Sequence, residues 1–416
     1  MTHEHAFVAP LAAPAPSFAT PAPAPSLATP ARAPLAWPLG FRAFTAHGGL
    51  RAEGDDISAV VSDRPAVSAA MFTRSRFAGP AVLLSRAHAA GRRLRAVVTL
   101  AQNANVATGA EGERNAAEVV ARLAPVLGTS TGEVLLGSTG VIGRPLPMVA
   151  LRTRIAALGP AVFGAAPLDV ARAMMTTDTR PKTAERRVGA ARLVGVAKGV
   201  GMLEPDMATM LAHVFTDAAL TPDALDAAWR AAVDDSFHCL SVDTDTSTSD
   251  TAAVLANGAA GPVDETAFAA ALREVCLDLV RQLARDGEGA TKLLRVEVSG
   301  ARDRAQARGV AKSVVNSPLV KAAVHGADPN WGRVVMAVGK NADDTDIDPA
   351  RVTVRFGALP VYPAEPGAAA LAALTEVMRR EEVTIGVGLG IGEAEATVYG
   401  CDLSAGYVRI NADYTS

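Results

Sequence analysis

The stretch GVAKGVGMLEPDMATMLAHVFTD, residues 195–217, constrains the fold more than any other part of this sequence. Its first half carries three glycines, and glycine permits backbone turns that other residues resist. Pro205 and the small Ala208 lead into Thr209, after which the residues become apolar in the manner of a buried strand. We therefore expect Thr209 to lie where a flexible loop leads into a buried strand, which other layers of the protein must cover.

Thr209 also has the chemistry that self-cleavage requires. A hydroxyl at the start of a strand can attack the preceding carbonyl, here that of Ala208, and water can then hydrolyse the resulting ester. The freed α-amine would have a pKa of about 7.7–8.0, so it could act as the general base for its own hydroxyl. From these residues alone, a purely structural threonine after a glycine loop is the more ordinary interpretation.

The composition excludes several classes of protein. The 416 residues suffice for one large domain or for two to three smaller ones. The net charge is -3 without a basic block, which argues against a nucleic-acid partner, and no apolar run is long enough to span a membrane. The three cysteines, Cys239, Cys276 and Cys401, are far apart and form no CxxC pair. We therefore expect reduced thiols in a cytoplasmic protein, with no metal site.

Residues 1–39 differ from the rest because they are dominated by Ala and Pro. Such a composition predicts a disordered or polyproline-like tail. The segment lacks a basic stretch followed by a clean apolar one, so it is not predicted to be a secretory signal, and a targeting role is the alternative. Folded sequence is expected from about Gly40 onward.

Periodicity predicts a mixture of helices and strands. Helices are expected over 115–127 with a stop at Gly128, from a Thr221 cap toward His238, over 264–284, and over 367–380. The predicted strands are ISAVVSD, SAAMFTRSRF, AVLLSR, LLRVEVSG, RVTVRFG, VTIGVGLG, ATVYGCDL and YVRINADY. The pattern favours α and β layers packed together over a regular βαβ array.

Two further polar motifs allow more than one interpretation. The run DTDTSTSDT, residues 243–251, could bind a cation, but a turn whose Asp and Thr side chains cap backbone groups is the more ordinary structure. GSTGVIG, residues 137–143, could be a phosphate loop, yet it lacks the Lys-Ser/Thr that follows in a P-loop. A plain glycine turn is the other possibility.

The order and length of several motifs resemble those of the ornithine acetyltransferase family, the glutamate N-acetyltransferases. The likeness runs from about residue 40 to residue 416. It is carried by STGVIG at 138–143, TTDTRPK at 176–182, KGVGMLEPDMATML at 198–211, DTDTSTSDT at 243–251, DGEGATKL at 286–293, NSPLVKAAVHGADPNWGR at 316–333 and GCDLSAGYVRINADYTS at 400–416.

The resemblance implies roles for the residues around the cleavage motif. It makes the bond between Ala208 and Thr209 the site of autocatalytic cleavage, and Thr209 the nucleophile. Lys198 matches the family's substrate-binding lysine, and a cation there would favour the neutral amine by charge repulsion; a solvated loop lysine is the alternative. Thr139 and Gly140 match the oxyanion-hole pair, one hydroxyl and one backbone N–H.

The remaining implied residues bind substrate. Thr176 and Thr177 match the family's substrate-binding segment, and the sequence does not show which hydroxyl points inward. Glu288 matches a glutamate that could hold the substrate's ammonium group, with an exposed loop acid as the alternative. Asn411 and Ser416 match positions where the carboxyl end closes over the substrate, although chain ends usually fray.

The implied fold is an α/β (α+β) protein of the self-cleaving, N-terminal-nucleophile type: an αββα sandwich with a smaller C-terminal domain. Residues 40–208 would form the α fragment and residues 209–416 the β fragment, and the fragments would assemble as α2β2. The implied reaction moves the acetyl group of N-acetylornithine to glutamate by a ping-pong route through acetyl-threonine, with no cofactor. Whether acetyl-CoA also serves as a donor stays open.

Some residues depart from the commonest family pattern. LAQNAN at 100–105, VDTDTSTSD at 242–250 and FTRSRFAGP at 72–80 look more like the subgroup linked to clavulanic acid gene clusters, which leaves the physiological donor and acceptor open. An amidase or aminopeptidase with the same nucleophile is one alternative function. A non-catalytic amino-acid-binding protein is another.

Overall fold

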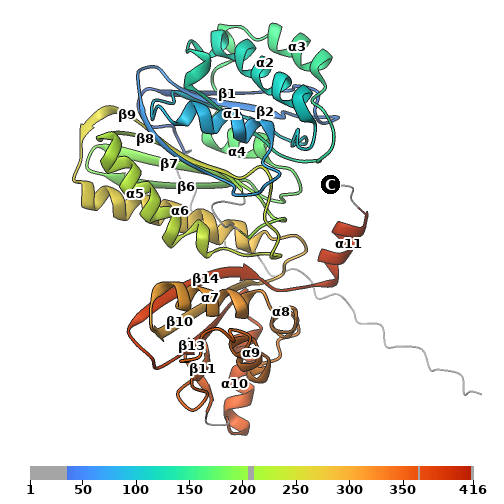
Figure 1. Ribbon diagram of the computed structural model, residues 1–416, viewed down its shortest axis with the longest axis vertical. Helices are drawn as coiled ribbons and strands as arrows, with labels where there is room; N and C mark the ends of the chain where they lie inside the picture. The colour runs from blue at the N-terminus through green and yellow to red at the C-terminus, as the bar shows by residue number, and fades with distance from the viewer. Residues whose placement is uncertain (1–34, 205–209, 364–365, 414–416) are drawn as a thin grey trace, which may run out of the picture. The chain divides into compact units, whose positions relative to one another are not determined.

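The computed structural model describes residues 35–204, 210–363 and 366–413 (Figure 1). The folded unit begins at Leu35, slightly before the expected residue 40, because Trp37 and Leu39 are tied to the body of the protein. The Trp37 ring N–H donates to the Ala165 carbonyl at 2.8 Å, and the Leu39 N–H donates to Asp217 at 2.8 Å. The rest of the predicted tail, 1–34, lies outside the described residues.

The first sheet has four strands in the order β1-β2-β4-β5. Only β4 and β5 run parallel; the other neighbouring pairs are antiparallel. All residues of β2, β4 and β5 are buried, which indicates that both faces of this sheet are covered. The strands are β1 (Phe41–Ala46), β2 (Ile57–Ser62), β4 (Ala96–Leu100) and β5 (Val134–Ser138).

The second sheet has five strands in the order β3-β9-β8-β7-β6, with β8 and β9 parallel. Along β8, Leu211 and Phe215 belong to one apolar cluster, whereas Ala212 and Val214 belong to another. Because side chains alternate along a strand, this sheet too has an apolar layer on each face. The strands are β3 (Val67–Phe72), β6 (Lys182–Val188), β7 (Ala191–Lys198), β8 (Leu211–Ala219) and β9 (Thr251–Pro262).

The two sheets face each other between helical layers, as Figure 1 shows. One apolar cluster joins both inner faces and includes α4 (Pro167–Met174). The outer face of the first sheet packs against α2 (Gly109–Leu127) and α3 (Met148–Ala156), and that of the second packs against α5 (Pro222–Asp235) and α6 (Glu265–Arg285). The predicted αββα sandwich is therefore confirmed.

A third sheet follows in the C-terminal part and has its own apolar core. Its strand order is β12-β11-β13-β10-β14, with β10 and β13 parallel. The strands are β10 (Leu293–Ala301), β11 (Thr353–Phe356), β12 (Leu359–Tyr362), β13 (Glu382–Gly388) and β14 (Ala394–Cys401). The helices are α7 (Arg304–Val315), α8 (Pro318–His325), α9 (Trp331–Gly339) and α10 (Ala368–Met378).

Local signals placed several helix ends correctly. Gly128 ends α2 in the left-handed region at φ 67°, where glycine carries no steric penalty. The Thr221 hydroxyl accepts from the Ala224 N–H at 3.2 Å at the start of α5, with Pro222 in the first turn. The helix ends at Asp235, and the short turns η1 (Thr131–Glu133), η2 (Pro160–Val162) and η3 (Phe237–Cys239) complete the element order.

Two predicted strands are wrong because both are helical. AVLLSR lies in α1 (Pro80–Ala89), where Pro80 occupies the first turn and the buried residues Ala81, Val82 and Ser85 follow helical spacing. YVRINADY lies largely in α11 (Ala405–Asp413), which has no buried residue, so its alternation of apolar and polar residues does not mark a buried face. Segments this short do not separate the two periods.

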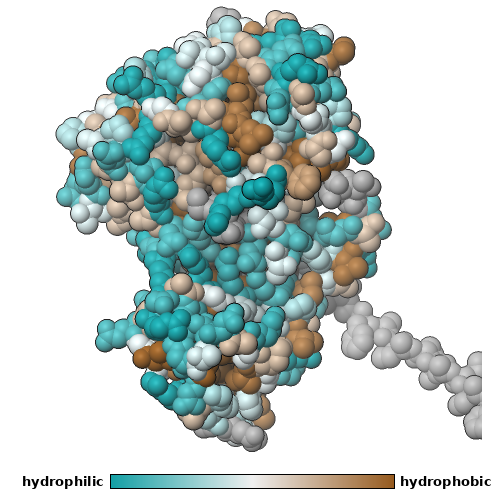
Figure 2. Space-filling view, viewed as in Figure 1, coloured by the Kyte–Doolittle hydropathy of each residue, from teal (hydrophilic) through white to brown (hydrophobic). Residues whose placement is uncertain are grey.

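The distribution of hydrophilic residues on the surface is what we expect if the apolar faces are buried between the layers. On the face drawn in Figure 2, hydrophilic residues cover most of the area and apolar patches are separate. All three cysteines are buried free thiols. No helix among the described residues has the length and apolarity needed to span a bilayer.

Candidate active site

A cavity lies where β5, β7 and β8 reach the turn that precedes β9. The residues that line it are far apart in the sequence, from position 104 to position 411. Seven positions predicted from the sequence line it: Thr139, Gly140, Thr176, Thr177, Lys198, Glu288 and Asn411. Three other predicted positions, Ala208, Thr209 and Ser416, lie outside the described residues.

Thr139 and Gly140 directly follow β5. The Thr139 N–H donates to the Leu100 carbonyl at 3.0 Å, which fixes the turn, and the residue is only 9% exposed. Gly140 has φ 133°, and a Cβ there would collide with the backbone of Gln102, so only glycine fits. The Gly140 N–H has no partner among the described residues, which leaves a backbone donor at the cavity wall.

Lys198 ends β7 with its side chain inside the protein. Its Nζ donates to the Thr139 Oγ1 at 3.2 Å, and the residue is 8% exposed. Burial lowers the pKa of Lys198, because the charged amine loses its water. The alternative of a solvated loop lysine is therefore wrong: pairing of β7 with β8 carries Lys198 into the core.

A buried ion cluster holds the Thr176–Thr177 segment in place. The Lys182 Nζ lies 2.7 Å from an Asp178 oxygen and 2.6 Å from an Asp286 oxygen. Asp178 also accepts from the Thr176 N–H at 3.1 Å, and Asp286 accepts from the Thr179 N–H at 3.0 Å. Lys182, 1% exposed, therefore ties the segment before β6 to the loop that follows α6.

This cluster was not predicted, although its members lie in quoted motifs. Lys182 and Asp286 are 104 positions apart, so no local spacing indicates the pairing. Asp178 keeps a pKa below its ordinary value: burial alone would raise it, but the charges of Lys198 and Lys182 outweigh that effect. The Gly199 N–H also donates to Asp178 at 2.8 Å, which joins the cluster to the end of β7.

Glu288 reaches the cavity from a loop. Its N–H donates to the Val200 carbonyl at 2.9 Å, which sets the loop against the chain after β7. A Cβ at Gly201 would collide with the Glu288 carboxylate, so the glycine makes room for the acid. The Asn411 Nδ2 donates to Glu288 at 2.9 Å. The alternative of a free, exposed loop acid is wrong, because Glu288 is half-buried and has a partner.

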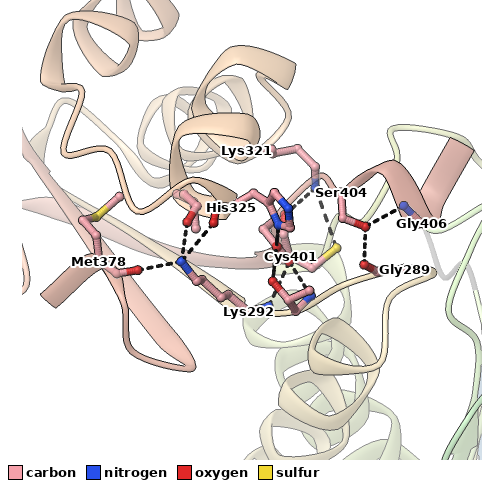
Figure 3. Close-up of polar contacts among 11 residues, drawn as sticks. Gly289, Lys292, Lys321, His325, Met378, Cys401, Ser404 and Gly406 are labelled. Carbon is pink, nitrogen blue, oxygen red and sulfur yellow. Dashed lines mark hydrogen bonds and ion pairs between the residues drawn. The ribbon is translucent and has the colours of Figure 1, made fainter. Parts of the chain in front are cut away.

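The loop that carries Glu288 is bonded to the chain that leads into α11 (Figure 3). The Ser404 hydroxyl donates to the Gly289 carbonyl at 2.6 Å and accepts from the Gly406 N–H at 3.0 Å. A side chain at Gly289 would collide with the backbone of Tyr407, so the two segments are in close contact. This contact brings Asn411 of α11 to the cavity.

The third sheet supports the same junction through two lysines, seen in Figure 3. The Lys321 Nζ donates to the Cys401 carbonyl at 2.6 Å, where β14 ends. The Lys292 Nζ donates to the Val324 carbonyl at 2.7 Å and to the Met378 carbonyl at 2.8 Å, near the ends of α8 and α10. Cations are favourable at helix C-termini, so Lys292 secures the start of β10.

The chain beside Thr209 is described from Met210 onward. Met210 lines the cavity, and its carbonyl accepts from the Thr251 N–H at 2.9 Å, where β9 starts. The residue bonded to Thr209 is therefore fixed at the cavity wall by the parallel pairing of β8 and β9.

The polar turn before β9 also lines the cavity. Asp243 accepts from the Met202 N–H at 2.6 Å and from the Leu203 N–H at 2.7 Å, which confirms the predicted capping turn. Residues 247–250 of this turn face the cavity, which was not predicted. The one sequence signal was the position of Asp250, the last acid before an apolar run.

Comparison with known proteins gives consistent matches. The ArgJ family model matches residues 42–416. Glutamate N-acetyltransferase Oat2 of Streptomyces clavuligerus is 55% identical over 389 residues, covering 91% of this chain and 98% of that protein. Arginine biosynthesis bifunctional protein ArgJ of Rhodococcoides fascians is 52% identical, covering 92% of this chain and 95% of that protein. The crystal structure of the argJ protein of Bacillus halodurans is 38% identical and covers 48% of this chain and 96% of that chain, with a TM-score of 0.45.

Proposed function

The chain belongs to the ArgJ family and is an acyltransferase of the glutamate N-acetyltransferase type, and we propose that the cavity described above is its active site. The observation that carries the proposal is the hydrogen bond between Lys198 and Thr139 inside that cavity. It joins the expected substrate-binding cation to the expected oxyanion donor, at the wall formed by the residue bonded to Thr209.

The proposed nucleophile is Thr209, freed by cleavage after Ala208. Its α-amine, with a pKa of about 7.7–8.0, would take the proton of its own hydroxyl as that oxygen attacks the acetyl carbonyl. The position of Met210 supports this assignment, because a strand end fixed by the Thr251 N–H would hold the adjacent nucleophile firmly.

The tetrahedral intermediate would be stabilised by the Thr139 hydroxyl and the Gly140 N–H. Such donors are effective when they are preorganised and shielded from water. Thr139 is buried and its backbone is fixed, and the Gly140 N–H has no partner among residues 35–204, 210–363 and 366–413. Collapse of the intermediate would release the amine of ornithine and leave the acetyl group on Thr209.

Substrate binding would use the charges at the two ends of the cavity. Lys198 would bind the α-carboxylate that donor and acceptor share, and Glu288 would hold the side-chain ammonium group of the ornithine donor. Thr176 and Thr177 would supply hydroxyls between them, and Asn411 would orient Glu288. Ser416 is proposed to complete the carboxyl end. The donor would be N-acetylornithine and the acceptor glutamate, with no cofactor.

The two fragments would remain together after cleavage. Strands β6 and β7 come from the α fragment and β8 and β9 from the β fragment, yet all four pair in one sheet. Separation would break the β7–β8 and β3–β9 pairings and expose a large apolar core. We propose an α2β2 assembly in the cytoplasm. Light scattering of the purified protein, with denatured mass spectrometry, tests the assembly and the cut.

A product assay tests the function. Purified protein is incubated with N-acetylornithine, with and without glutamate, and ornithine, N-acetylglutamate and free acetate are quantified. Ornithine and N-acetylglutamate should rise together, and only when glutamate is present. Acetate release without glutamate would instead indicate a hydrolase with the same nucleophile. Binding of ornithine without any turnover would indicate a non-catalytic amino-acid-binding protein.

A further inference from the structure

Two carboxylates and one buried ammonium group form a bridge beside the cavity, which we define as Asp178, Lys182 and Asp286. The Lys182 Nζ donates to Asp178 at 2.7 Å and to Asp286 at 2.6 Å. Asp178 lies in the segment before β6, and Asp286 directly follows α6. Charge-assisted hydrogen bonds are strong, and a buried ion that loses its partner is left uncompensated. The bridge is therefore a firm link between the two segments.

The Asp178 end of the bridge fixes the cavity wall that carries Lys198. Asp178 accepts from the Gly199 N–H at 2.8 Å, and Gly199 is the residue bonded to Lys198. It also accepts from the Thr176 N–H at 3.1 Å. Both Lys198 and Thr176 line the cavity. This end of the bridge therefore holds the residue proposed to bind the α-carboxylate of the substrate.

The Asp286 end of the bridge restrains the loop that carries Glu288, two residues further along the chain. The Glu288 N–H donates to the Val200 carbonyl at 2.9 Å, but a single hydrogen bond allows a loop to pivot. A second cavity of about 610 Å³, lined in part by Gly287 and Gly289, lies beside the same loop. Packing around the loop is therefore incomplete, and the ion pair at Asp286 supplies a second fixed point.

We infer that the bridge sets the distance between Lys198 and Glu288, and thereby selects the length of the diamino acid that the site accepts. The inference rests on the proposed function, in which Lys198 binds the α-carboxylate of the donor and Glu288 its side-chain ammonium group. A homologue with one methylene group more or fewer could not place both groups correctly if the two residues are held at a fixed spacing. Lys182 and Asp286 are thus positioning residues that act through Glu288.

Kinetics with donors of different length test the inference. With glutamate as acceptor, kcat/KM is measured for N-acetylornithine and for the α-acetylated forms of lysine, one methylene group longer, and of 2,4-diaminobutyrate, one shorter. The wild type should prefer N-acetylornithine by roughly 10–200-fold, the usual effect of one methylene group. Asp286→Ala breaks the bridge but leaves Lys182 paired with Asp178, so this preference should fall about tenfold. The ratio does not depend on how much of the enzyme is folded.

Glu274→Gln is the matched control, because Glu274 also joins α6 to β6. It pairs with Arg186 at 2.7 Å, but it is 59% exposed and is not among the residues that line the cavity. This variant should keep the preference of the wild type. An equal fall of kcat/KM for all three donors in Asp286→Ala, with the preference unchanged, overturns the inference. A wild type that uses the three donors equally well overturns it too.

A second variant and a binding measurement cover the remaining outcomes. If Asp286→Ala does not fold, Asp286→Asn replaces it, because it keeps the shape of the side chain and removes the charge; an unchanged preference again overturns the inference. A wild type that turns over none of the donors refutes the proposed function. Calorimetry with free ornithine, lysine and 2,4-diaminobutyrate then still tests the bridge: the wild type should bind ornithine most tightly, and equal discrimination by wild type and variant overturns the inference.

Discussion

Three cavity residues, Thr139, Lys198 and Asp250, lie at strand ends in the central sheets and are at most 9% exposed; we call them the buried end of the cavity. Two others are more exposed, and we call them the open end: Glu288 lies on a loop and is half-buried, and Asn411 lies on the exposed helix α11. The buried end is held by strand pairing on both sides of the cavity. The open end is held mainly by side-chain hydrogen bonds such as that from Ser404 to Gly289.

This difference separates two tasks of one site. Stabilising a developing charge requires donors that do not move and that are shielded from water. Recognising a substrate requires contacts near the entrance, which can form equally in the ground state and the transition state. Changes at the buried end should therefore lower kcat, and changes at the open end should mainly raise KM.

The largest expected effect comes from the nucleophile. Thr209→Ala should abolish both self-cleavage and turnover, because it removes the hydroxyl that both steps use. Denatured mass spectrometry reports the cut, and the product assay reports turnover. Thr209→Ser is the control, which should still cut. A Thr209→Ala protein that still cuts itself and turns over substrate would show that Thr209 is not the nucleophile, and the comparison of the two ends of the cavity would then lose its basis.

The next effect concerns the oxyanion donor at the buried end. Thr139→Val keeps the shape of the side chain but removes its hydroxyl, so kcat should fall roughly 10²–10³-fold. Thr183→Val, a half-buried threonine of β6, is the control and should leave kcat unchanged. Steady-state kinetics measure kcat and KM for both variants. A rise in KM with unaltered kcat would assign Thr139 to substrate binding instead.

A smaller effect on stability should follow from the titration of His213, a buried residue of β8. Burial lowers the pKa of His213 from 6.5 to about 3, and neither ring nitrogen has a hydrogen bond of ordinary geometry among the described residues. The unfolded chain therefore binds the proton first as the pH falls, and stability should drop between pH 6.5 and about 3.

The slope due to His213 should be at most about 1.4 kcal/mol per pH unit. Urea unfolding of wild type and His213→Leu across that window measures it. The variant should show a shallower loss of unfolding free energy on acidification. Parallel curves for the two proteins would mean that His213 does not titrate with unfolding.

The smallest effect should come from the open end. Asn411→Ala removes the hydrogen bond to Glu288, which is worth about 1 kcal/mol, so KM should rise about fivefold with little change in kcat. Arg409→Ala, exposed on the same helix, is the control. A loss of kcat as large as that of Thr139→Val would show that the two ends do not divide the tasks.

The sequence indicated much of the fold and most of the site. Caps such as Thr221 and stops such as Gly128 act on neighbouring residues, so their effect can be recognised in a short window. The αββα arrangement and the site residues came from motif resemblance. The helix α11 was misassigned because an exposed segment has no buried face for periodicity to report.

By itself, the sequence determined the chemistry of the individual residues: a threonine after a small residue, a lysine at the end of an apolar run, and glycines where the backbone turns. Only the tertiary structure decided which charges are paired and which are not. Lys182 meets Asp286 across 104 positions and Lys198 meets Thr139 across 59, because burial depends on which strands come together. Since the energy of a buried charge depends on its surroundings, this part of the site is settled by packing between distant segments.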